Sequence, residues 1–220
     1  YIPWGATVPD NEGNYYYTSF SPAGYFAPWL FMKIFGLSVN EESLYIFNLI
    51  LLLISAFLWM YLLALVYEES EFQHVLCFIG GFSYVFLPEI LHGMGIVYWH
   101  QSMMQVTLLL QVFAYYRYVI QQSKKWKYFF YLMALINPYI EWTGYVANAG
   151  FAISEMIRNN DKGVIKAFVE VFKLGIITVA SFALFFAHYL LRIDPDIFLQ
   201  ALKNRFLARN ITTDVALTEV

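Results

Sequence analysis

The sequence has few charged residues and only one cysteine. Charged residues make up 13% of the 220 residues, and the formal net charge is -3. No run of lysine or arginine is longer than Lys124-Lys125, so the chain offers no basic field for nucleic acid. Cys77 has no second cysteine with which to form a disulfide inside the chain. Nucleic-acid binding and internal disulfides are therefore excluded.

Motifs that identify several enzyme classes are also missing. The chain has no Gly-Lys-Ser/Thr phosphate loop, no Gly-x-Ser-x-Gly elbow, no Cys-x-x-Cys pair and no His-Glu-x-x-His helix. These absences disfavour ATP-driven transport, serine hydrolysis and zinc-protease chemistry. The sequence starts at Tyr1 in a polar stretch, without an initiator methionine. We expect a partial chain, with at least one membrane span before it.

Apolar and aromatic residues are abundant. They reach 60% and 20% of the sequence, and the mean hydropathy is positive. Such a composition lies outside the usual range of soluble domains. The apolar runs are too continuous for the alternating pattern of barrel strands, and in lipid a helix satisfies its own backbone hydrogen bonds. The predicted fold class is all-α, a polytopic transmembrane helical bundle in an integral, multi-pass membrane protein.

The apolar runs predict where the helices cross. Four runs have about the length needed to span a bilayer, namely 44–66, 75–91, 103–120 and 164–191. A fifth, 128–157, is interrupted by Asn137-Pro138 and by Glu141. Proline removes a helix hydrogen bond, and a carboxylate at the bilayer centre costs roughly 2.5 to 3.5 kcal/mol. We therefore predict two short helices there, and about six crossings in all.

Basic residues set the predicted orientation. Clusters flank the interrupted stretch, with Lys124, Lys125 and Lys127 before it and Arg158, Lys162 and Lys166 after it. An even number of crossings between them puts both clusters in the cytoplasm. Segments 1–23, 92–101 and 137–143 then lie on the outer, periplasmic or lumenal, side. The predicted domains are an outer loop with an interfacial aromatic helix (1–43), a transmembrane domain (44–192), and an outer amphipathic helix and tail (193–220).

The outer segments hold most of the candidate site residues. Glu141 is a candidate for function, with a helix-packing hydrogen bond as the alternative. A carboxylate at Asp10 or Glu12 could deprotonate an acceptor hydroxyl, although acidic residues are also common in turns. Aromatic rings can stack on a sugar, or can form a membrane-interface belt. The candidate substrate-binding residues in these segments include His92, Tyr98, His100 and Trp142.

Two stretches carry a family resemblance. Residues 16–26 read YYTSFSPAGYF, and residues 31–36 read FMKIFG, just before the long apolar run at 44. This pattern resembles the C-type (GT-C) membrane glycosyltransferases, which include aminoarabinose transferases and protein O-mannosyltransferases. In that superfamily a Pro-Pro-aromatic segment ending in Lys-x-Phe-Gly precedes a long transmembrane helix. Here Ser21-Pro22-Ala23 stands where the family often has Lys or His before two prolines.

The resemblance implies transfer of a sugar from a polyprenyl-phosphate donor to a lipid, glycan or protein acceptor at the outer face. It implies that Asp10 is catalytic and that Ser21, Pro22 and Tyr25 adjoin the substrate. A cation or a divalent metal would stabilise the departing phosphate, and we expect Arg205 or Arg209 to reach a lipid phosphate. The expected partners are membrane lipids and the lipid-linked sugar donor.

Two other functions remain open from the sequence. The chain could be a transporter or flippase, with a broken-helix site at Asn137-Pro138 and Glu141. It could also be a non-catalytic membrane scaffold, in which Gly80-Gly81 lets another helix approach closely.

Overall fold

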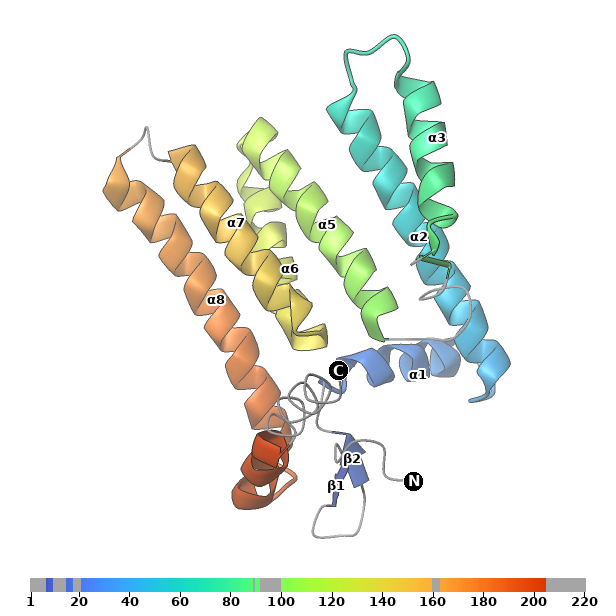
Figure 1. Cartoon of the computed structure of the whole chain (residues 1–220), viewed down its shortest axis with the longest axis vertical. Coiled ribbons are helices and arrows are strands. Elements are labelled where there is room, and N and C mark those ends of the chain that lie inside the picture. Colours follow the sequence, from blue (N-terminus) through green and yellow to red (C-terminus); the bar gives the residue numbers. More distant parts are fainter. Residues whose placement is uncertain are drawn as a thin grey trace, which may run out of the picture. The chain divides into compact units, whose positions relative to one another are not determined.

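Helices form most of the protein (Figure 1). The structure is a computed structural model that describes residues 7–9, 15–17, 21–88, 90–91, 100–159 and 163–204. The helical fold class predicted from the apolar runs is confirmed for these residues. Contacts divide the chain into two units, Pro22–Ser181 and Tyr1–Ser21 with Phe182–Val220.

Helix α1 spans Ala23–Phe35 and is an aromatic helix within 1–43, the segment for which one is predicted. It ends at Gly36, whose left-handed conformation (φ 65°) suits glycine because no Cβ clashes there. The Leu37 amide then donates to the Met32 carbonyl at 2.8 Å, which closes the last turn in a Schellman motif. Helix α1 contacts α5 (His100–Gln121) and α6 (Lys124–Ile140), and Figure 1 shows it lying across the start of α5.

Helix α2, Glu41–Val66, is a long apolar helix with a well-defined start. The Asn40 side chain accepts a hydrogen bond from the Ser43 amide at 2.9 Å, and Glu41 and Glu42 lie in the first turn. Both features stabilise a helix N-terminus. Twenty-six residues extend about 39 Å, more than the roughly 30 Å of a hydrocarbon layer. The helix predicted at 44–66 is confirmed.

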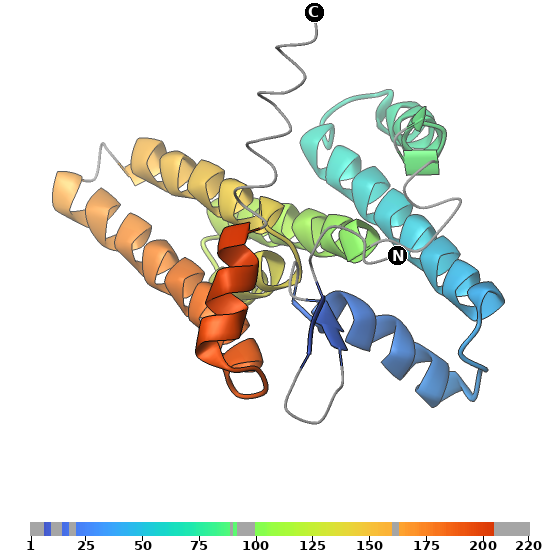
Figure 2. The same ribbon diagram turned by 60° about the horizontal axis from the view of Figure 1, so that its bottom comes forward.

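Helix α3, Gln73–Val85, packs alongside α2 (Figure 2). A Cβ at Gly80 would collide with the Leu63 side chain, and one at Gly81 with Met60. The predicted close approach of a helix at these glycines is therefore confirmed, and the neighbour is α2. The predicted end at residue 91 is wrong for α3. Proline 88 disfavours the helical conformation at Leu87, and the helix has stopped before it.

Helices α5, α6 and α7 (Thr143–Asn159) are consecutive neighbours in the sequence and in space (Figure 1). Two residues join α5 to α6, and two join α6 to α7, which makes each pair antiparallel. The two short helices predicted within 128–157 are confirmed. The turn falls at Glu141 and Trp142, within the predicted outer segment 137–143. The predicted interruption at Asn137-Pro138 is wrong, because Pro138 lies inside α6.

Helix α8, Val164–Leu190, is the second long apolar helix. Among the residues that the structure describes, α2 and α8 are the two helices long and apolar enough to cross a membrane. The crossings predicted at α3, α5, α6 and α7 stay predictions. Apolar packing joins α5, α6 and α8 around Ala114, Phe130, Ala134 and Leu174.

The smaller unit contains the end of α8 and a two-stranded ladder. Strands β1 (Thr7–Pro9) and β2 (Tyr15–Tyr17) pair antiparallel, an element that the sequence did not predict. A helix at 195–204 follows Asp194, whose Oδ1 accepts from the Asp196 amide at 2.9 Å. This helix lies within 193–220, the segment for which a helix is predicted. Phe198 of this helix is fully buried and stacks on Tyr189 of α8.

Candidate functional site

Glu141 is a buried carboxylate at the turn between α6 and α7. Its side chain is 6% exposed, and its Oε2 accepts hydrogen bonds from the Thr143 amide at 2.7 Å and from the Thr143 hydroxyl. Thr143 is the first residue of α7, so the carboxylate satisfies a free amide at the positive end of that helix. In this structure Glu141 therefore forms local hydrogen bonds at the start of α7, and its functional role stays a prediction.

Other predicted site residues lie on or beside α1 and α7. Trp142 is 40% exposed and stacks on Tyr145, with ring centroids 5.6 Å apart. Pro22 precedes α1, and its carbonyl accepts from the Tyr25 amide at 3.0 Å. Tyr25 is half exposed, and Ser21 is buried. Helix α1 contacts α6, the helix that ends beside Glu141, so Tyr25 and Glu141 belong to contacting segments.

The remaining predicted residues fall in the parts that the structure leaves undescribed. His100 is the first residue of α5, and its side chain lies outside the described part of the structure. Six residues lie outside the described ranges, namely Asp10, Glu12, His92, Tyr98, Arg205 and Arg209. Their assignment as catalytic or substrate-binding residues stays a prediction.

Sequence reasoning missed a chain of buried amides that joins the helices. Gln111 of α5, Asn137 of α6 and Asn148 of α7 are each at most 2% exposed. Gln111 donates to Asn148 Oδ1 at 2.9 Å, and Asn137 donates to Gln111 Oε1. Asn148 donates to the Thr178 hydroxyl of α8 at 2.9 Å. One polar network therefore connects four helices.

The same network repairs the helix at Pro138. A proline has no amide hydrogen, so the carbonyl four residues earlier, that of Ala134, loses its normal helix partner. The Asn148 side chain donates to this carbonyl at 2.8 Å. Gly144 makes the approach feasible, because a Cβ there would collide with the backbone of Asn137 and Pro138. The close contact of α6 and α7 thus replaces the hydrogen bond that proline removes.

A second missed feature is a charged cluster at the far end of these helices. Glu155 of α7 is 3% exposed and pairs with Arg158, with Arg158 Nη2 2.6 Å from Glu155 Oε2. Arg158 also donates to the Tyr118 hydroxyl of α5 at 2.7 Å. The Asn159 amide group donates to the Glu155 carboxylate at 3.0 Å. These bonds satisfy a carboxylate that would otherwise be buried without a partner.

Glu170 of α8 gathers cations from two helices. Its Oε2 lies 2.6 Å from Lys127 Nζ of α6, and its Oε1 lies 2.9 Å from Lys173 Nζ. The Tyr131 hydroxyl also donates to Glu170 Oε2 at 2.8 Å. Glu170 is therefore neutralised by its own neighbours and holds Lys127 in place.

A pocket of about 250 Å³ opens between these charged groups. Four cationic side chains and one carboxylate line it. Its lining residues come from the ends of α5 and α7 and from the starts of α6 and α8, and they are Tyr118, Gln122, Lys124, Lys127, Arg158, Asn159, Lys166 and Glu170. Residues of both basic clusters therefore lie at the same end of the helices. Their placement in the cytoplasm stays a prediction.

The described part of the chain contains no group of three or more His, Cys, Asp or Glu residues arranged to hold a metal ion. These described residues therefore offer no candidate ligands for the divalent metal that the resemblance implies. The metal stays a prediction that concerns the undescribed segments.

Comparison with models of protein families, with curated proteins and with solved structures found no match to this chain.

Proposed function

We propose that this chain belongs to a GT-C-like integral membrane glycosyltransferase that moves a sugar from a polyprenyl-phosphate donor to a lipid, glycan or protein acceptor. The order of its first helices carries the proposal. Helix α1 ends in Lys33-Ile34-Phe35-Gly36, a glycine closes it, and the long apolar helix α2 follows. A short aromatic helix with this ending, placed just before a long span, is the feature that the sequence shares with that superfamily.

Exposed apolar surface supports insertion in a membrane. Within the most apolar 18-residue windows of α2 and α8, only 28% and 22% of the residues are buried. The core helix of a soluble protein would be mostly covered. Leu53 and Phe57 of α2 and Val179 of α8 are each more than half exposed. Leaving such side chains in water is unfavourable by about 1.5 to 3 kcal/mol each, and lipid removes that cost.

The proposed topology has six crossings, with the basic pocket in the cytoplasm and the Glu141 turn outside. Lys127 near the start of α6 and Arg158 near the end of α7 line one pocket, which supports an even number of crossings between the two basic clusters. Cysteines placed at Lys125 and at Asn160 in a Cys77→Ala background should react with a membrane-impermeant reagent from the same side. Labelling from opposite sides contradicts this topology.

The proposed chemistry places a carboxylate and a cation at the outer face. Asp10 or Glu12 would take the proton of the acceptor hydroxyl as it attacks the sugar carbon. Arg205 or Arg209, or a divalent metal, would stabilise the negative charge of the departing polyprenyl phosphate. A general base of this kind typically contributes 100-fold to 10,000-fold in rate.

Sugar transfer in proteoliposomes tests the proposal. The complete protein would be supplied with a polyprenyl-phosphate sugar, and transfer would be measured for Asp10→Ala, Glu12→Ala and Glu141→Ala. We expect at least one of the first two to lose about 100-fold or more in turnover. Glu69→Ala, in the link between α2 and α3, is the matched carboxylate control and should leave turnover unchanged. Wild-type turnover in all three test variants would remove the site assignment.

One observation favours a second candidate, a transporter or flippase. Among the described residues, Asn137 Oδ1 is buried without a hydrogen-bond partner, in the middle of the amide network. An unpaired acceptor at that depth could bind a polar solute group. The scaffold alternative has less support, because Gly80 and Gly81 already pack on α2 of the same chain.

A further inference from the structure

The basic pocket lies at the opposite end of α6 from Glu141. Helix α6 has 17 residues and is about 25 Å long, with Lys124 at its start and Glu141 just after its end. The pocket is therefore separate from Glu141. Its volume of about 250 Å³ is large enough for a phosphate group with its substituents.

Two of its cations are fixed in place and two are unpaired. Glu170 holds Lys127, and Glu155 holds Arg158, through the ion pairs described above. Lys124 and Lys166 are exposed and have no ion-pair partner among the described residues. A chain with a net charge of -3 thus concentrates positive charge at one pocket. Repulsion between these cations decreases when an anion binds between them.

The helix ends strengthen the attraction for an anion. Helices α6 and α8 both begin at the pocket, and neither has an acidic residue in its first turn. The Ser123 side chain makes no capping hydrogen bond to α6. The N-terminus of a helix is positively polarised, and lysines there are unfavourable unless an anion accompanies them. Lys124 and Lys166 occupy these first turns.

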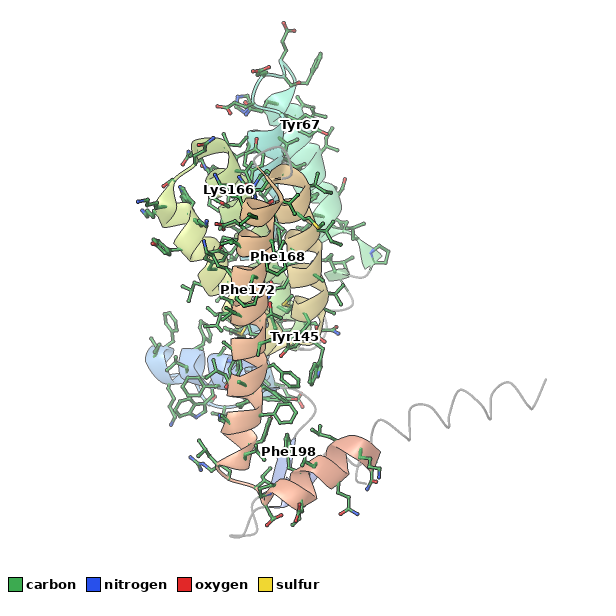
Figure 3. All side chains as sticks on the ribbon, turned by 90° about the vertical axis from the view of Figure 1, so that its left-hand side faces the viewer. Tyr67, Tyr145, Lys166, Phe168, Phe172 and Phe198 are labelled. Atoms are coloured by element: carbon green, nitrogen blue, oxygen red, sulfur yellow. The ribbon has the colours of Figure 1, made fainter. Side chains whose placement is uncertain are left out.

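An apolar surface adjoins the pocket along α8. Ile165, Phe168 and Phe172 are 83%, 66% and 58% exposed. In Figure 3 the labelled Phe168 and Phe172 follow Lys166 down α8 and away from the pocket end. A ligand with a charged head and apolar tails would contact both surfaces. A soluble phosphate compound would leave the apolar surface uncovered.

We propose that the pocket binds the phosphate group of an acidic phospholipid, whose acyl chains lie along the exposed face of α8. Lys124 and Lys166 contact the phosphate directly, and Lys127 and Arg158 supply positive charge from fixed positions. Basic pockets between membrane helices are suited to such headgroups. The proposal requires that α8 lies in lipid, but it does not require sugar transfer.

Binding of phosphatidylglycerol to the purified full chain in nonionic detergent tests this site. Phosphatidylcholine and inorganic phosphate are titrated in parallel, and the dissociation constants are compared. Each lysine or arginine near a lipid phosphate strengthens binding, and its loss should weaken binding about fivefold. We expect Lys124→Gln and Lys166→Gln each to raise the dissociation constant for phosphatidylglycerol about fivefold. Lys125→Gln is the matched control, because Lys125 is the exposed neighbour of Lys124 but does not line the pocket.

The outcomes separate the ligand classes. Specific loss in the two pocket variants, with wild-type binding in Lys125→Gln, supports the lipid site. Equal loss in all three variants indicates general surface attraction and overturns it. If phosphatidylcholine binds as tightly as phosphatidylglycerol, the net charge of the lipid is not recognised and the proposal is wrong. If inorganic phosphate binds as tightly as phosphatidylglycerol, the ligand is a soluble anion and not a lipid.

Discussion

Replacing Asn148 by alanine removes three hydrogen bonds from the junction of four helices. Asn148 accepts from Gln111 and donates to the Ala134 carbonyl and the Thr178 hydroxyl. Interhelical hydrogen bonds in membranes average about 0.6 kcal/mol each, so the loss is about 2 kcal/mol. That is about a thirtyfold increase in the unfolding equilibrium constant. The Ala134 carbonyl adds to the effect, because Pro138 leaves it without any helix partner.

Equilibrium unfolding of the purified chain in mixed micelles, followed by tryptophan fluorescence, measures this effect. Val146→Ala is the matched control on α7, because Val146 is 74% exposed and should change stability little. Thr178→Val should cost about 0.6 kcal/mol alone and almost nothing once Asn148 is alanine. Additive costs for Asn148 and Thr178, or wild-type stability of Asn148→Ala, would refute the assignment of this network.

Two further substitutions test the packing and the charged cluster by the same unfolding measurement. Gly144→Ala places a Cβ against the backbone of α6 and should lower the free energy of unfolding by about 1 to 3 kcal/mol. In the control Gly150→Ala the new Cβ meets nothing within 4 Å, and the free energy of unfolding should rise by up to about 1 kcal/mol. Equal effects of the two substitutions would contradict the close approach of α6 and α7. Arg158→Ala leaves the buried Glu155 carboxylate without its ion-pair partner and should lower the free energy of unfolding by about 3 to 5 kcal/mol. Adding Glu155→Gln removes the unpaired charge and should restore most of that stability. No recovery in the double variant would contradict the importance of the ion pair.

The long apolar runs were enough to predict most helices. The runs at 44–66 and 164–191 match α2 and α8 closely. In a long apolar run no side chain competes for the backbone hydrogen bonds, and a helix satisfies all of them within the segment. The end of α3 was misplaced and the interruption expected at Pro138 is absent, so proline was involved in both errors. Before Pro88 the helix stopped early, whereas Pro138 was accepted because Asn148 of another helix replaced the lost bond.

The sites were harder to predict because they combine residues from different helices. Gln111 lies in an apolar stretch and looks like an isolated polar residue, and its partner Asn148 is 37 residues away in the chain. Lys127 and Glu170 likewise meet only when α6 and α8 pack together. Apolar periodicity indicates which segments are helical, but the rotation of each helix about its axis decides which polar groups meet. Buried Asn, Gln and Glu within apolar runs were the available signal.

The amide network also has a consequence for biosynthesis. Thr178 is 30 residues after Asn148, so the ribosome delivers it later, by about 2 to 6 seconds at the usual rate of about 5–20 residues per second. During that interval a nascent α7 carries an amide donor that has no acceptor on the final segment. In the proposed six-crossing topology, release of the early helices into bulk lipid would expose this donor, so α5, α6, α7 and α8 should leave the insertion machinery together.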